Sequence, residues 1–181
     1  MKKSELQELV IEAIIAEVGE ANSIVFDYTK EYDDLYTFTT DTGKEIDVDF
    51  EDITDNIAGS NCDVLSNAIE ANILDNIYTF SYSADGKFGQ GEKSTVSELL
   101  RILSTVSEIG VDFADNISPQ FIHVTAAPRD KETGENDSAK MKIYKKILSN
   151  KLDSNWSVID NCTINLKKGG SKTGLLLYKN N

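Results

Sequence analysis

The chain has 181 residues, of which 40% are hydrophobic, so it can build one sizeable core but hardly two independent domains. Its formal net charge of -13 disfavours a protein that binds nucleic-acid phosphates or an acidic membrane surface. No apolar run approaches the roughly 20 residues that span a bilayer, and no signal-peptide core opens the sequence. We expect a single cytosolic domain over residues 1–181, without a membrane or a direct nucleic-acid partner.

The N-terminal segment predicts an amphipathic helix. Apolar residues recur at helical spacing over residues 4–18, glutamates fill most of the other side, and Gly19 is suited to end the helix. We assign residues 1–20 to this helix and residues 24–181 to an α+β core.

A hairpin is predicted next. Strands over residues 24–28 and 35–40 lead into a turn in which Gly43 supplies a positive φ. The return strand, residues 45–51, alternates strictly, so one face is expected in the core and the other in water. The acidic side chains on its polar face are Asp47, Asp49 and Glu51.

The middle of the chain predicts a helix and a further strand. Residues 53–76 are ambiguous, but Val64, Leu65, Ala68, Ile69 and Ile73 within them fit a helix better than a strand, with Asn61 or Asp63 as its N-cap. A strand follows over residues 77–83, and Asp85-Gly86 is typical of the turn of a second hairpin.

A long helix and a central strand come after it. Thr95 and Glu98 predict a capping box, and Pro119 ends the helix. Residues 121–126 are apolar on both faces, as in a central strand. A strand, a crossover helix and a second strand predict one parallel pair within a mostly antiparallel sheet.

The C-terminal part predicts a lysine-rich helix over residues 141–152 and closing strands over residues 156–159, 162–166 and 175–178. The fold class is therefore α+β, with a mostly antiparallel mixed sheet and two helices packed on it.

The rare residues exclude several kinds of site. Cys62 and Cys162 are too few for a disulfide framework or a four-thiolate zinc site. The single histidine, His123, excludes most catalytic triads and histidine metal sites, and it is expected to pack within its strand, with a role as general base as the alternative. We expect no metal.

The glycine-rich segment before the long helix is the most motif-like stretch. It resembles a phosphate-binding loop, but Glu92 interrupts the required Gly-Lys-Ser order. A helix N-terminus can still hold a pyrophosphate without a catalytic lysine. The candidate residues for this are Gly89, Gly91, Lys93 and Ser94.

Charge is unevenly distributed along the chain. Residues 139–181 hold nine lysines and two acidic residues, whereas the rest of the chain is strongly acidic. The lysines that we expect on an interaction surface are Lys142, Lys145 and Lys146. The carboxylates of the strand over residues 45–51, about 6.6 Å apart on alternate residues, either imitate nucleic acid or protect a sheet edge.

Two resemblances follow from the second half of the chain. Residues 103–109, with Phe113 and Pro119, residues 121–126 and Lys142-Ile143-Tyr144 resemble a group of small tailed-phage proteins of uncharacterised activity. That resemblance implies a phage or prophage origin and a location in the bacterial host cytoplasm or the virion.

The order of elements is also similar to that of GNAT acetyltransferases: hairpin, glycine-containing turn, helix, strand, helix with a tyrosine, closing strands. This resemblance implies that the turn with Gly89 and Gly91 binds the pyrophosphate of acetyl-coenzyme A. It implies that Tyr144 protonates the leaving thiolate. In such an enzyme we take His123 or Glu98 as the candidate base.

Three functions are compatible with these observations. The first is a phage-type accessory or virion-associated protein that binds a protein partner or itself, without catalysis or cofactor. The second is a GNAT-like acyltransferase that uses acetyl-coenzyme A. The third is an acidic inhibitor that imitates nucleic acid to block a host defence enzyme.

Overall fold

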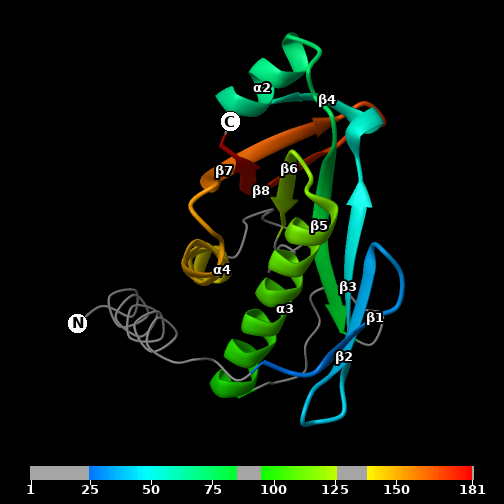
Figure 1. The fold of residues 1–181 in the computed structure, drawn as a ribbon, viewed down its shortest axis with the longest axis vertical. Helices are drawn as coiled ribbons and strands as arrows, with labels where there is room; N and C mark the ends of the chain where they lie inside the picture. The colour runs from blue at the N-terminus through cyan, green and yellow to red at the C-terminus, as the bar shows by residue number, and fades with distance from the viewer. Residues whose placement is uncertain (1–24, 85–94, 126–137, 181) are drawn as a thin grey trace, which may run out of the picture.

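The computed structural model describes residues 25–84, 95–125 and 138–180, whose arrangement Figure 1 shows. These residues form one eight-stranded mixed sheet and three α-helices, which confirms the α+β class. The expected N-terminal helix and the turn at residues 85–86 lie outside the described residues.

The sheet has the strand order β1-β2-β3-β5-β6-β8-β7-β4. Every neighbouring pair is antiparallel except β5 and β6, so the mostly antiparallel sheet is confirmed. The strands are β1 Tyr28–Lys30, β2 Leu35–Thr39, β3 Glu45–Asp52, β4 Ile57–Ser60, β5 Ile77–Ala84, β6 Phe121–Val124, β7 Trp156–Leu166 and β8 Ser171–Lys179.

The long helix α3, Val96–Ile117, is the crossover between the parallel strands β5 and β6, as predicted. The Thr95 hydroxyl caps it by accepting a hydrogen bond from the amide of Glu98 at 3.2 Å. The helix ends at Ser118, whose φ of 52° is left-handed, and Pro119 follows directly.

The helices cover the two faces of the sheet unequally. α3 and α4, Ser138–Lys151, pack on one face over a first core that includes the stacked rings of Phe50 and Phe113, 3.8 Å apart between centroids. On the other face the shorter α2, Asp63–Glu70, covers a second core with Leu65 and Ala68. α2 lies at one end of the sheet beside β4 and β7 (Figure 1).

The prediction of a strand over residues 24–28 is wrong at its boundaries. β1 begins only at Tyr28. The chain before it turns to α3, because the buried amide of Phe26 donates to the hydroxyl of Thr105 at 2.9 Å. A tertiary hydrogen bond takes the place of a strand ladder there.

The helix predicted within residues 53–76 is present as α2, but its N-cap is neither Asn61 nor Asp63. A 3-10 turn, η1 Thr54–Asn56, and the strand β4 precede α2, and the N-cap residue is Cys62, without a side-chain cap. Asn61 does not cap the helix, because its Oδ1 accepts from the amide of Thr163 at 2.6 Å.

Two of the closing strands are in fact one. β7 runs unbroken from Trp156 to Leu166, and a bulge at Asn161, with φ of 55°, shifts its register against β8.

A disulfide bond joins Cys62 to Cys162, whose Cα atoms lie 5.5 Å apart. The sequence alone assigned no role to these two cysteines.

Candidate functional site: the junction of two parallel strands

The strands β5 and β6 part at their carboxyl ends. β5 pairs with β3 as far as Ala84, but it pairs with β6 only as far as Phe80, opposite Val124. The amide of Thr125 still donates to the carbonyl oxygen of Phe80, at 3.3 Å. We call this place, from Phe80 to Ala84 beside the end of β6, the β5/β6 junction. Ligands of open α/β sheets bind at the carboxyl ends of parallel strands.

Gly174 fixes the path of the chain at the end of β6. A Cβ atom on Gly174 would lie 2.9 Å from the carbonyl carbon of Val124 and closer still to its oxygen. Real Cβ atoms essentially never approach backbone atoms within 3.0 Å. Only glycine lets β8 pass this close to the end of β6.

Tyr144 reaches the junction from α4. Its ring meets that of Tyr82 of β5 edge to face, with the centroids 6.5 Å apart and the planes at 61°. Tyr144 is 1% exposed, so the whole side chain is buried in the first core. Burial, and then the charge interaction and the hydrogen bond with Tyr82, raise the pKa of Tyr144 well above its ordinary value.

His123 lies on the opposite face of the sheet from Tyr144. Its Nε2–H donates to the carbonyl oxygen of Cys162 at 3.0 Å, and among the described residues its Nδ1 has no hydrogen-bond partner. Burial, with a smaller effect of the Lys172 ammonium, lowers the pKa of His123 to about 4, so the ring is neutral at pH 7. The fold therefore does not bring the two candidate catalytic residues together.

The candidate phosphate-binding residues Gly89, Gly91, Lys93 and Ser94 lie outside the described residues. The described ends of that segment are Ala84 of β5 and Thr95 at the start of α3. The segment therefore joins the carboxyl end of a parallel strand to the N-terminus of its crossover helix, where backbone amides lack partners within the helix.

The three acidic residues of β3 share one face, as predicted, but the interpretation that they protect a sheet edge is wrong, because β3 pairs with β2 on one side and β5 on the other. Asp47, Asp49 and Glu51 lie opposite Ser83, Ser81 and Thr79 of β5 in the ladder. Burial, and then the charges of Asp34 and Glu51, raise the pKa of Asp49. Glu51 forms an ion pair with Lys172, whose ammonium lies 3.2 Å from the Glu51 carboxylate. The same ammonium lies 3.3 Å from the Thr79 hydroxyl.

The three lysines proposed for interaction all belong to α4. Lys142 and Lys146 are exposed, whereas Lys145 forms an ion pair with Asp160 of β7. Lys145 therefore contributes to the attachment of α4 to the sheet, and Lys142 and Lys146 keep the surface positions expected of them.

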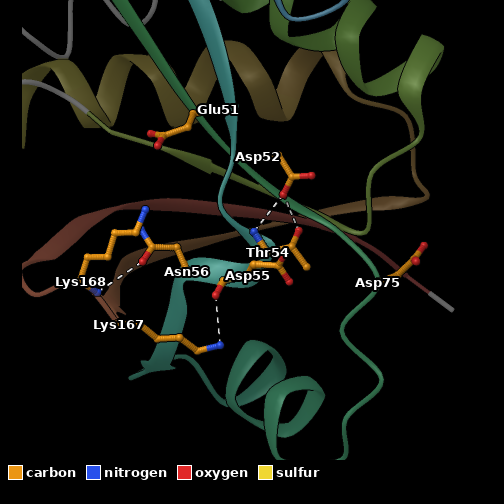
Figure 2. Close-up of a pocket in the computed structure, with 8 residues that line it drawn as sticks. All are labelled: Glu51, Asp52, Thr54, Asp55, Asn56, Asp75, Lys167 and Lys168. Atoms are coloured by element: carbon orange, nitrogen blue, oxygen red, sulfur yellow. Dashed lines mark hydrogen bonds between the residues drawn. The ribbon is translucent and has the colours of Figure 1, made fainter.

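A polar hollow next to η1 has no counterpart in the predictions. Figure 2 shows its lining, Glu51, Asp52, Thr54, Asp55, Asn56, Asp75, Lys167 and Lys168. Its side chains bind one another: Asp52 accepts from the amide and the hydroxyl of Thr54, and the ammonium of Lys167 donates to the carbonyl oxygen of Asp55 at 3.1 Å. The Asp-x-Thr spacing of Asp52 and Thr54 is a local sequence signal for this turn. No sequence signal near Asp52 predicts that Lys167 and Lys168 lie beside it.

Within the described ranges, no group of three or more His, Cys, Asp or Glu side chains is placed to hold a metal ion. In the same part of the chain, no helix is both long enough and apolar enough to cross a membrane.

Comparison with protein-family models, with curated proteins and with solved structures finds no match for this chain.

Proposed function

We propose that the protein binds acyl-coenzyme A at the β5/β6 junction and transfers its acyl group, in the manner of a GNAT-like acyltransferase. The observation that carries the proposal is the parting of two parallel strands at their carboxyl ends. The glycine-rich segment follows β5 directly in the sequence and precedes α3, which supports a phosphate-binding role for it.

Tyr144 supports the chemistry of this proposal. Its phenol, whose ordinary pKa is 10, carries a proton at neutral pH, and burial raises that pKa further. It touches Tyr82 in the part of β5 that extends beyond β6, which is where the acyl end of the cofactor would lie. The bound thioester would supply the acyl group, and the role of Tyr144 is to give its proton to the departing thiolate.

The position of His123 argues against a role as general base. Its neutral ring faces the second core, and its Nε2–H is held by the Cys162 carbonyl. We therefore assign the ring a structural role and leave the acceptor to lose its proton to solvent or to its own ionisation.

Binding is tested by thermal unfolding with coenzyme A and acetyl-coenzyme A. A ligand at a hundred times its dissociation constant stabilises by about 2.7 kcal/mol, which shifts the melting temperature by several degrees. The variant Gly91→Asp should lose the shift, because it adds a negative charge to the phosphate-binding segment. Gly59→Asp in β4 is the matched control, since a side chain there meets open space. No shift of the unmodified protein at millimolar ligand would reject the function.

Catalysis is tested separately with Tyr144→Phe. This variant keeps the ring contact with Tyr82 and loses only the hydroxyl, so the shift by coenzyme A should persist. Thiol release from acetyl-coenzyme A with a panel of amines and alcohols should fall by about 10²-fold or more. Unchanged turnover would remove Tyr144 from the mechanism.

A second candidate is a non-catalytic role in assembly, as expected of a phage-type accessory protein. Burial, and then the charges of Asp34 and Glu51, raise the pKa of Asp49, and such a group of carboxylates favours a cationic partner. The exposed Lys142 and Lys146 of another copy offer one. Sedimentation should then show self-association at low salt, lost at high salt and in Asp47→Asn/Asp49→Asn. A monomer at every salt concentration would contradict this candidate.

A further inference from the structure

We propose that Cys62 and Cys162 form a reversible redox lock, which holds α2 on the sheet when oxidised and releases it when reduced. This inference is independent of the proposed acyltransferase activity. It starts from the fact that the only two cysteines of the chain, 100 residues apart, are bonded to each other.

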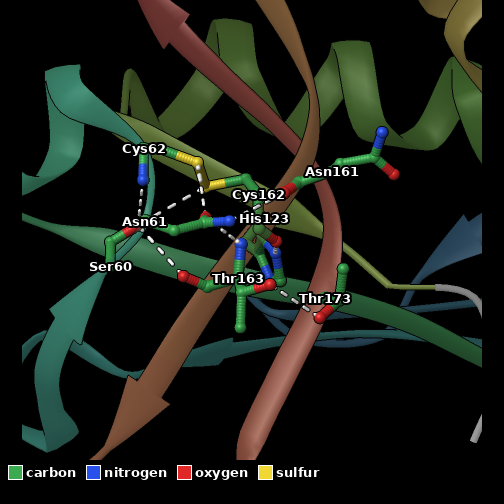
Figure 3. The surroundings of a disulfide bond; sticks show 8 residues. All are labelled: Ser60, Asn61, Cys62, His123, Asn161, Cys162, Thr163 and Thr173. Atoms are coloured by element: carbon green, nitrogen blue, oxygen red, sulfur yellow. Dashed lines mark hydrogen bonds between the residues drawn. A yellow bond between two sulfur atoms is a disulfide. The ribbon is translucent and has the colours of Figure 1, made fainter.

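The bond joins the outermost part of the sheet to its body. Figure 3 shows Cys62, the residue before α2, bonded to Cys162 in the middle of β7. Both sulfur atoms belong to the second core, which α2 covers. The lock therefore acts where α2 begins.

α2 has few attachments of its own. Among its residues only Leu65 and Ala68 are buried, and the turn after the helix leaves Ile73 64% exposed. Elements with little buried apolar surface open locally at low free energy. The disulfide is thus one of the few attachments of the first turn of this helix to the sheet.

β4 keeps its place without the disulfide. Its backbone pairs with β7 through Ile57 opposite Leu166 and Ser60 opposite Ile164, and the Asn61 side chain accepts from the amide of Thr163. Reduction therefore removes one attachment among several. It should loosen α2 while the eight-stranded sheet stays folded.

The two cysteine residues differ in exposure. Cys62 is 6% exposed at the edge of the second core, whereas Cys162 is 0% exposed between β4 and β8. A thiolate from solvent therefore attacks Sγ of Cys62 first, since disulfide exchange requires access to the sulfur attacked.

The exchange balances with small thiols alone. The incoming thiolate bonds to Sγ of Cys62, the S–S bond breaks, and Cys162 leaves as a thiolate that takes a proton from water. A second small thiol then displaces Cys62 and forms a small-molecule disulfide, so two electrons pass from the thiols to the protein. Closing is the reverse reaction with a small-molecule disulfide such as glutathione disulfide.

Opening would uncover an apolar surface. Beneath α2 the second core contains Ile77, Phe121 and Leu176, from three neighbouring strands. Movement of α2 brings these side chains nearer to water, which gives the reduced state a surface that the oxidised state lacks.

The lock is tested by amide hydrogen exchange of the full chain with and without dithiothreitol. We expect exchange in residues 63–70 to rise about tenfold or more on reduction, with exchange in the α3 residues 102–113 unchanged. The double variant Cys62→Ser/Cys162→Ser should behave like the reduced protein in both conditions. Equal exchange of α2 in the two redox states, or parallel loosening of α3, would overturn the proposal.

The order of attack is tested with the single variants and glutathione disulfide, followed by mass spectrometry. Cys162→Ser should take up glutathione at Cys62 about tenfold faster than Cys62→Ser takes it up at Cys162. Equal rates would contradict the assigned order. The unmodified protein, equilibrated with glutathione disulfide and then alkylated, should carry no alkyl group. Two alkylated cysteines would show that the pair does not close and would overturn the lock itself.

Discussion

Gly110 of α3 lies against the ring of Phe80 in β5, so that a Cβ atom on Gly110 would sit 3.6 Å from Cε1 of the ring. That is an ordinary van der Waals distance, and a methyl group fits without displacing its neighbours. Glycine within a helix destabilises it by roughly 0.5–1 kcal/mol relative to alanine. We expect Gly110→Ala to raise the free energy of unfolding by about that amount, measured by urea denaturation. A loss of stability would mean that α3 packs more tightly on the sheet than described.

Gly174 should respond in the opposite direction. Alanine there would collide with the Val124 carbonyl group, which belongs to the backbone and cannot rotate away. We expect Gly174→Ala to lower the free energy of unfolding by about 3 kcal/mol, the upper end for an overpacked site. Gly59→Ala adds the same methyl group to β4 in open space and should change stability little. Similar losses in both variants would contradict the close approach of β8 to β6.

His123 should make stability depend on pH. Its pKa is about 4 when folded and 6.5 when unfolded, so between these values the unfolded chain binds a proton that the folded protein does not. The stabilisation is therefore complete above pH 6.5 and is lost as pH falls to 4, by about 3 kcal/mol. Denaturation of His123→Gln, compared with the unmodified protein across this range, isolates the histidine from the carboxylates. Parallel pH profiles would show that the ring is not buried as a neutral group.

Thr105 should stabilise the connection between α3 and the start of β1. Its hydroxyl accepts from the amide of Phe26 and donates to the carbonyl oxygen of Arg101, at 2.9 and 2.8 Å. Thr105→Val keeps the shape but leaves the buried Phe26 amide without its acceptor, which costs about 1–3 kcal/mol. Ser107→Ala removes a hydroxyl that donates only to Leu103 of the same helix, so its effect should be smaller. Thermal unfolding of both variants makes the comparison.

Features with local causes could be predicted from the sequence. The strict alternation around Val48 places apolar residues of β3 in the first core and carboxylates on the other face. The buried faces of β6 follow from its unbroken apolar run, and the bounds of α3 follow from Thr95 and Pro119. In each case the deciding interaction lies within a few residues of the signal.

Features decided by distant partners could not be predicted. β4 has four weakly patterned residues, Ile57–Ser60, and is a strand only because β7 pairs with it. His123 and Tyr144 lie on opposite faces of the sheet because α4 covers the face away from the histidine. The sequence around His123 does not predict which face α4 covers. The disulfide and the Asn161 bulge also need the assembled sheet.

The position of β4 at the far edge of the sheet has a consequence for the newly made chain. β4 and α2 leave the ribosome well before β7, the strand that pairs with β4, because β5, α3, β6 and α4 are made between them. While these intervening residues are made, at about 5–20 residues per second, the apolar side chains of α2 lack the part of the sheet that β7 and β8 form. This segment is therefore synthesised before the strand against which it must pack. A nascent chain arrested before Trp156 should carry it as an exposed apolar element, to which chaperones are expected to bind.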